Sequence, residues 1–213
     1  MLTPSQMEEL FIHSSCDKNI SVIEGVMGLY DGKDDSVSDG STSSIAKQLK
    51  SPVILIINVS GMAQSAGAVA LGYKEMDSDI DIKGIILNKV GSHQHYKTAA
   101  SSIESNAHIP VLGYLARNAE IELPERHLGI LPSFEKDEKE DFIGKIRIQI
   151  EETVDIESLI RIAQNAADIE SLREDEYIFP AEPLYNVDIA LAYDEAFNFY
   201  YQHNLEILES YGV

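Results

Sequence analysis

The sequence predicts an α/β fold in which helices flank a mostly parallel β-sheet. Short apolar runs predict strands at 52–59, 84–90 and 110–115, and the first two are rich in β-branched residues. Strands of this kind that alternate with helices are typical of parallel sheets. Because parallel strands end at one edge of a sheet, polar residues that follow these strands are the first candidates for a ligand site.

The N-terminal part is predicted to add one more strand and two helices. Apolar residues at helical spacing predict a helix over 4–14. A short apolar run at 20–23 predicts a buried strand that carries Glu24 at its carboxyl end. A glycine-containing turn then presents Asp31, and the polar segment 34–44 predicts a loop that caps the next helix.

Glu24 and Asp31 are the candidate catalytic and metal-binding residues. Hard cations such as Mg²⁺ prefer oxygen ligands and usually keep several waters, so two carboxylates at one strand end could hold a hydrated Mg²⁺ or orient a phosphate-bearing intermediate. The alternative interpretation is a strand end with a glycine turn and two solvated acids.

Polar residues also follow the later strands. Asn88 lies near the end of the 84–90 strand, where its amide could donate to and accept from an adenine edge at once; alternatively the backbone satisfies it. Arg117, Arg126 and His127 follow the 110–115 strand. An arginine fork suits carboxylates and phosphates, so these residues are candidates for phosphate or substrate contact.

The C-terminal part is predicted to form helices, a linker and the start of another domain. Residues 136–167 have helical periodicity, whereas 168–186 lose it and contain prolines, which indicates an interdomain linker. An apolar segment at 187–193 predicts a strand, and an aromatic-rich amphipathic helix follows it. His93 and His95 lack a third metal ligand nearby in sequence and are interpreted as polar residues at a helix start.

Charge, cysteine content and the length of apolar runs argue against several classes of protein. The chain has 213 residues, with 36 acidic and 16 basic side chains and a net charge of −20, which argues against a nucleic-acid partner. The one cysteine, Cys16, excludes an internal disulfide and fits a reducing compartment. No run approaches the ~20 apolar residues of a membrane span. We therefore expect a soluble, cytoplasmic protein.

Several motifs together resemble one known family. In order they are EGVMGLYDG, GSTSSIAKQLKSPVILI, GIILNKV, PVLGYLAR, LPERHLGI and DEAFNFYYQHNLEILE. Their collinear order resembles that of cobyrinic acid a,c-diamide synthase. That family joins a P-loop ATPase domain of the dethiobiotin synthetase and MinD type to a class I glutamine amidotransferase domain. Members are considerably longer, and this chain resembles their middle section.

The resemblance implies a domain organisation. Residues 1–167 would be the C-terminal part of the ATP-dependent synthetase domain, a P-loop NTPase-like core without its phosphate-loop strand. Residues 168–186 would be the linker, and 187–213 would be the first strand and helix of a truncated glutaminase-like domain. No G-x-x-x-x-G-K-[ST] phosphate loop occurs in the chain. We therefore expect this chain to bind ATP weakly or not at all and to be inactive alone, needing further N- and C-terminal segments or a homodimer.

The resemblance also implies a reaction and its cofactors. ATP with Mg²⁺ would phosphorylate the a- and c-acetate groups of cobyrinic or hydrogenobyrinic acid, and ammonia from glutamine would convert them to amides. Ser41 and Thr42 would lie near this substrate, with Arg126 and His127 as further contacts; each hydroxyl could equally serve as a helix cap. Family members usually carry an acid in place of Asn58, and Pro-Arg-Asp in place of the segment 116–118.

Two alternatives remain open at this stage. The same architecture could act on a nickel-bearing sirohydrochlorin, because the residues that select the macrocycle would lie upstream of this sequence. The chain could also be a non-catalytic α/β binding or regulatory module related to dethiobiotin synthetase.

Overall fold

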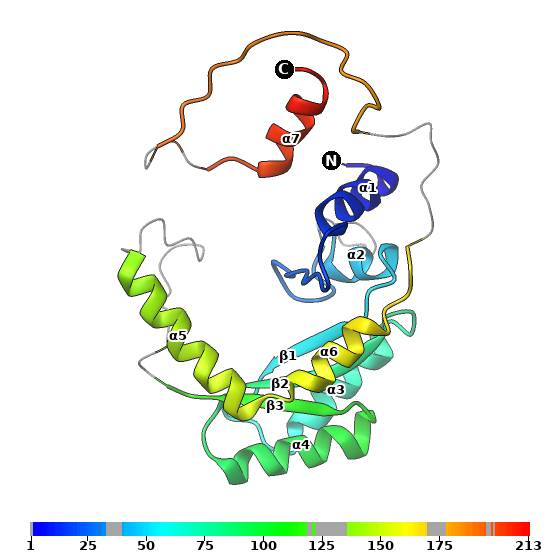
Figure 1. The fold of residues 1–213 in the computed structure, drawn as a ribbon. Coiled ribbons are helices and arrows are strands. Elements are labelled where there is room, and N and C mark those ends of the chain that lie inside the picture. Colours follow the sequence, from blue (N-terminus) through cyan, green and yellow to red (C-terminus); the bar gives the residue numbers. More distant parts are fainter. Residues whose placement is uncertain are drawn as a thin grey trace. The chain divides into compact units, whose positions relative to one another are not determined.

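The computed structural model describes residues 2–32, 40–118, 121, 136–169, 178–194, 197 and 199–213, with backbone only for 136–141 (Figure 1). Contacts divide the chain into two compact units. One consists of Met1–Ile23 with Asp168–Val213, and the other of Glu24–Ala167. Arg126 and His127 lie outside the described residues.

The larger unit is built on a parallel sheet. Strands β1 (Val53–Asn58), β2 (Ile82–Val90) and β3 (Val111–Ala116) pair in the order β1-β2-β3, and both pairings are parallel. Helices α3 (Ser65–Met76) and α4 (His93–Ala107) make the two crossovers between them. The predicted α/β class and its parallel sheet flanked by helices are therefore confirmed.

The core of this unit lies where α3 and α4 pack on the sheet. Ile85, Leu87 and Ile103 are fully buried there, and so are several alanines of the two helices. Small residues let the helices approach closely: a Cβ at Gly67 would lie 2.7 Å from the main-chain oxygen of Ser102. This packing fixes the carboxyl ends of the strands, from which both crossover loops start.

Three further helices belong to the larger unit. Helix α2 (Thr42–Gln48) precedes β1, and α5 (Lys136–Thr153) and α6 (Ile156–Gln164) follow β3. Asp155 caps α6 by accepting the N–H of Ser158 at 2.9 Å. The Asp155 N–H donates to the oxygen of Leu112 at 2.7 Å, which joins the start of α6 to β3.

Two predicted strands are absent from the described structure. Residues 20–25 and 187–193 have no regular secondary structure, and Val22 and Tyr193 are 91% and 70% exposed. An apolar run becomes a strand only where a neighbouring strand satisfies its backbone groups. Among the described residues no strand lies alongside either segment, so both predictions were wrong here.

The smaller unit contains helices α1 (Pro4–Ser15) and α7 (Gln202–Ser210). Thr3 and Gln6 form a capping box at the start of α1, which confirms the helix predicted over 4–14. Helix α7 covers part of the predicted C-terminal helix. The Ser14 hydroxyl on α1 and the Nε2 atom of His203 on α7 are 2.6 Å apart, so a hydrogen bond joins the two helices.

No helix in the described residues has the length and apolar character needed to cross a membrane.

Candidate functional site

The carboxyl ends of β1, β2 and β3 form the first group of predicted site residues. Asn58 of β1 is the register partner of Asn88 of β2. The main-chain oxygen of Asn88 accepts the N–H of Val59 at 3.0 Å. Leu87 pairs with Tyr114, and Val90 pairs with Ala116. Two residues of β2, Asn88 and Lys89, therefore lie opposite one residue of β3, Leu115. This irregularity is a bulge, a feature that often re-aims a side chain near an active site.

The bulge sets the conformation of Asn88. Lys89 has a φ of 57°, a left-handed conformation that is unusual for a residue other than glycine. The Asn88 Oδ1 atom accepts the Lys89 N–H at 2.8 Å and stabilises that turn. The Asn88 amide nitrogen has no described partner, and Oδ1 keeps a second lone pair. A half-buried asparagine with both functions available can therefore bind a complementary polar edge.

Arg117 connects all three strand ends. Its main-chain N–H donates to the Val90 oxygen at 2.8 Å, and its Nη2 atom donates to the Ser60 hydroxyl at 2.5 Å. The side chain is otherwise exposed, and a guanidinium has five N–H donors. Arg117 is thus held at the end of β2 through the backbone and retains donors for an anion.

Glu24 and Asp31 lie on one loop with a buried centre. Leu29 and Tyr30 are buried, whereas Glu24 and Asp31 are exposed. The Tyr30 hydroxyl donates to the Tyr73 oxygen at 2.6 Å. Burial, followed by the nearby Asp77 carboxylate, raises the pKa of Tyr30. These contacts anchor the middle of the loop and leave its carboxylates facing solvent.

The same loop packs on the start of α2. A Cβ at Gly25 would lie 2.7 Å from the Thr42 Oγ1 atom, so only glycine allows this approach. The Leu29 oxygen accepts the Ser43 N–H at 2.8 Å. The structure therefore brings the predicted residues Glu24 and Thr42 onto neighbouring segments.

Ser41 is the N-cap residue of α2. It is fully buried, caps α2 by accepting the Ser44 N–H at 3.1 Å, and lies 2.8 Å from the Ser43 hydroxyl. The helix-cap interpretation of Ser41 is therefore what the structure displays.

The predicted residues thus fall into two groups. No described hydrogen bond or ion pair joins Glu24 or Asp31 to Asn88. In the part of the chain that the structure describes, no three histidine, cysteine, aspartate or glutamate side chains could hold a metal together. A cation at Glu24 and Asp31 would therefore need water or phosphate oxygens as its other ligands. The roles of all these residues remain predictions.

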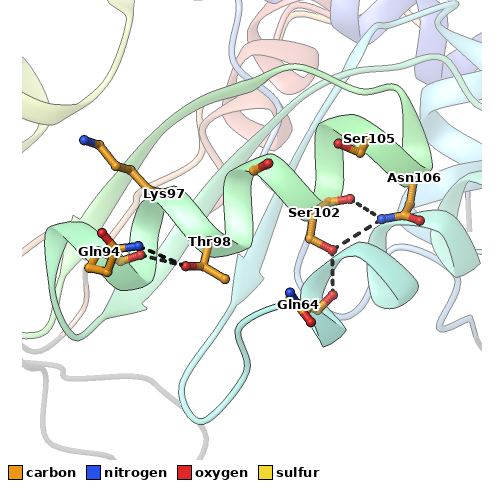
Figure 2. Close-up of a pocket in the computed structure, with 8 residues that line it drawn as sticks. Gln64, Gln94, Lys97, Thr98, Ser102, Ser105 and Asn106 are labelled. Carbon is orange, nitrogen blue, oxygen red and sulfur yellow. Dashed lines mark hydrogen bonds between the residues drawn. The ribbon is translucent and has the colours of Figure 1, made fainter.

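A polar depression lies elsewhere, between α3 and α4. It has a volume of about 660 Å³ and is lined by Gln64, Gln94, Lys97, Thr98, Ser101, Ser102, Ser105 and Asn106. Figure 2 shows that several of these groups bond to one another: the Ser102 hydroxyl donates to the Gln64 oxygen, and Asn106 donates to Ser102. None of the predicted site residues lines it.

Sequence reasoning missed one residue that contacts the loops after β1 and β2. His95, in the first turn of α4, contacts the loops after both β1 and β2 through its ring nitrogens. The only sequence signal was a histidine soon after a strand end, which we interpreted as a polar residue at a helix start.

Comparison with known proteins matches the chain to a family profile described as "AAA domain" over residues 4–125. Over its whole length it is 46% identical to a cobyrinate a,c-diamide synthase of Dehalococcoides mccartyi, covering 46% of that protein. The corresponding enzymes of Caldanaerobacter subterraneus subsp. tengcongensis and Priestia megaterium are 43% and 41% identical, again over the whole chain and over 46% and 45% of their lengths. The resemblance found from the motifs is confirmed. The chain spans just under half the length of these relatives. No solved structure gives a significant match.

Proposed function

Because the chain belongs to the AAA domain family, we propose that it is part of a cobyrinate a,c-diamide synthase and serves the ATP-dependent half of that reaction in a reducing cytoplasm. The observation that carries the proposal is the bulged end of β2 at the carboxyl edge of a parallel sheet, which contains Asn88 and, at Val90, bonds to the backbone of Arg117. The relatives named above supply the substrate class.

The reaction we propose has two steps for each acetate group. A carboxylate oxygen of cobyrinic acid attacks the γ-phosphorus of ATP, the bond to the bridging oxygen breaks, and ADP leaves. Ammonia released from glutamine then attacks the acyl carbon, inorganic phosphate leaves, and a proton is lost to give the amide. The protein contributes mainly by positioning the reactants and by neutralising charge on the transferred phosphoryl group.

Asn88 and Arg117 are assigned to the nucleotide. The amide nitrogen of Asn88, which has no partner among the described residues, can donate to an acceptor of adenine, while its oxygen can accept from the exocyclic amine. Arg117, held by Val90 and Ser60, directs its remaining N–H groups toward a phosphate or a carboxylate. Because these bonds already hold Arg117, it loses less conformational freedom when an anion binds than a mobile arginine would.

Glu24 and Asp31 are assigned to Mg²⁺. Their exposed carboxylates fit this ion, because Mg²⁺ is usually held by one or two carboxylates while water and substrate phosphates complete its shell. Bound there, the ion would neutralise charge on ATP. Thr42, which contacts the same loop at Gly25, is the residue we assign to the acidic substrate together with Arg126 and His127, whereas the buried Ser41 serves as the cap of α2.

The test uses the complete protein encoded by the reading frame that contains this chain. Incubated with cobyrinic acid, Mg-ATP and glutamine, it should form the a,c-diamide, detected by mass spectrometry, with matching release of ADP. Replacement of ATP by GTP should lower the rate, and Asn88→Asp should remove that preference. The proposal is wrong if the protein amidates no corrinoid, or if a nickel-bearing sirohydrochlorin is the better acceptor.

A further inference from the structure

His95 connects two loops that leave the sheet on either side of the proposed base site. Its Nδ1 atom accepts the N–H of Gly91, in the loop after β2, at 3.1 Å. Its Nε2 atom bonds to the main-chain oxygen of Met62, in the loop after β1. The ring is half-buried in the first turn of α4.

The two partners determine which tautomer is present. A main-chain N–H can only donate and a carbonyl oxygen can only accept. Nδ1 must therefore carry no proton, and Nε2 must carry the proton that it donates to Met62. Only the neutral ring with its proton on Nε2 makes both hydrogen bonds.

The cap of α4 is made by another side chain. Ser92 already caps α4, because its hydroxyl accepts the main-chain N–H of His95 at 3.1 Å. His93, one position into the same turn, is exposed, stacks on Tyr96 and makes no described hydrogen bond to either loop. The ring of His95 thus joins Gly91, the residue before the cap, to Met62 in the loop after β1.

Both loops support the residues assigned to the nucleotide. The loop after β1 contains Ser60, whose hydroxyl accepts a hydrogen bond from the guanidinium of Arg117. The loop after β2 begins directly beyond the bulge at Asn88 and Lys89. Because Met62 and Gly91 both bond to one rigid ring, the ring fixes the distance between the loop after β1 and the loop after β2.

We propose that His95 is a positioning residue for nucleotide binding: in its Nε2–H tautomer it holds the loops after β1 and β2 so that Asn88 and Arg117 face the base and phosphates. It does not touch the ligand. This inference rests on the proposed function, and it names a part of that site to which no sequence motif pointed.

Three variants separate the two contacts of the ring. His95→Asn places an acceptor oxygen near the position of Nδ1, so it can keep the bond to Gly91 and lose the bond to Met62. His95→Gln places an amide nitrogen near the position of Nε2 and does the reverse. His95→Phe keeps a ring and loses both bonds. His93→Phe is the matched control in the same helical turn.

Two NMR measurements on the isotopically labelled complete protein, encoded by the reading frame that contains this chain, test the proposal. Long-range ¹⁵N–¹H spectra should show a protonated Nε2 and an unprotonated Nδ1 in wild type. Titration with millimolar Mg-ATP, followed at the Asn88 side-chain amide, measures even weak binding. We expect Kd to rise about tenfold in His95→Phe, equivalent to about 1.4 kcal/mol, by smaller factors in His95→Asn and His95→Gln, and not at all in His93→Phe.

The outcomes distinguish the two ideas. If wild type binds Mg-ATP at Asn88 and His95→Asn, His95→Gln and His95→Phe bind equally well, His95 has no positioning role, although the proposed function stands. If Mg-ATP leaves Asn88 unperturbed in wild type while the tautomer is as expected, the proposed nucleotide site is wrong and the inference is wrong with it. A proton on Nδ1 would also overturn it. Should His95→Phe fail to fold, the Asn and Gln variants decide.

Discussion

Asn58 and Asn88 are register partners at the carboxyl ends of β1 and β2, and each folds its Oδ1 atom back onto the main chain that follows it. Asn58 accepts the Ser60 N–H at 3.0 Å, and Asn88 accepts the Lys89 N–H at 2.8 Å. They differ in setting: Asn58 is exposed, whereas Asn88 is half-buried beside a left-handed residue. The pair therefore provides a matched test of which strand end binds the nucleotide.

Asn88→Asp should abolish most adenine recognition without unfolding the protein. The carboxylate keeps an acceptor for the Lys89 N–H and loses the two amide donors. Asn88→Ala should also lose the turn hydrogen bond and about 1 kcal/mol of stability. Mg-ATP binding by NMR titration and urea unfolding measure the two effects separately. Asn58→Asp adds the same charge to the neighbouring strand as a control, and equal loss of binding in both variants would contradict the assignment.

Gly113→Ala should be strongly destabilising. Gly113 of β3 has a φ of 145°, and a Cβ there would lie 2.6 Å from the Cα atom of Val154. The added methyl group would push apart β3 and the segment that starts α6, which we expect to cost about 2–3 kcal/mol. Denaturant unfolding monitored by circular dichroism measures this loss.

Gly72→Ala is the control for that substitution. Gly72 is exposed in the middle of α3, and a Cβ there would meet no atom within 4 Å. Alanine should raise the free energy of unfolding by about 0.5–1 kcal/mol, because glycine is a poor helix former. If the two substitutions had similar effects, the close approach of β3 to Val154 would be wrong.

The sequence alone predicted the strands whose residues form a continuous apolar run. The runs at 52–59, 84–90 and 110–115 became β1, β2 and β3, because continuous apolar side chains can be buried on both faces of a parallel sheet. The runs at 20–23 and 187–193 have similar composition and formed no strand, because pairing depends on a neighbour that local sequence does not reveal.

The candidate site was predictable only in part. A polar residue at the end of a predicted strand made Asn88 a candidate, whereas nothing in the sequence indicated that the backbone at Gly25 packs on Thr42. The left-handed conformation of Lys89 had no signal, since lysine does not favour it. The contact of His95 with Met62 joins residues 33 apart, which spacing along one helix cannot show.

Acidification should weaken the larger unit through Asp77. The Lys47 Nζ atom donates to Asp77 Oδ2 at 2.7 Å. This hydrogen bond, followed by one from the Asp79 N–H, lowers the pKa of Asp77. A carboxyl group whose pKa is lower in the folded state stabilises the fold above its unfolded pKa, and that contribution is lost as pH falls through the folded pKa.

We therefore expect the free energy of unfolding to decline below the ordinary pKa of aspartate, and less steeply in Asp77→Asn. Urea unfolding at a series of acidic pH values measures the difference. Salt should reduce it, because the pair lies near the surface. Asp81→Asn, which removes an exposed carboxylate paired with Lys83, is the control. Identical pH profiles for wild type and Asp77→Asn would show that the pair contributes nothing.

Glu9 should control how residues 178–179 attach to α1 in the smaller unit. Its buried carboxylate accepts the Ile178 N–H at 2.6 Å and the Phe179 N–H at 2.9 Å. In Glu9→Gln one of these N–H groups would face an amide donor, so a hydrogen bond is lost in a buried place. The loss of a buried partner costs about 1–3 kcal/mol.

Hydrogen exchange measures this directly. The amides of Ile178 and Phe179 should exchange about tenfold faster in Glu9→Gln, or more, since each factor of ten corresponds to about 1.4 kcal/mol. Glu209→Gln, which neutralises an exposed carboxylate on α7, should leave both rates unchanged. Unchanged exchange in Glu9→Gln would mean that the stacking of His13 on Phe179, with ring centroids 4.0 Å apart, holds this segment without the carboxylate.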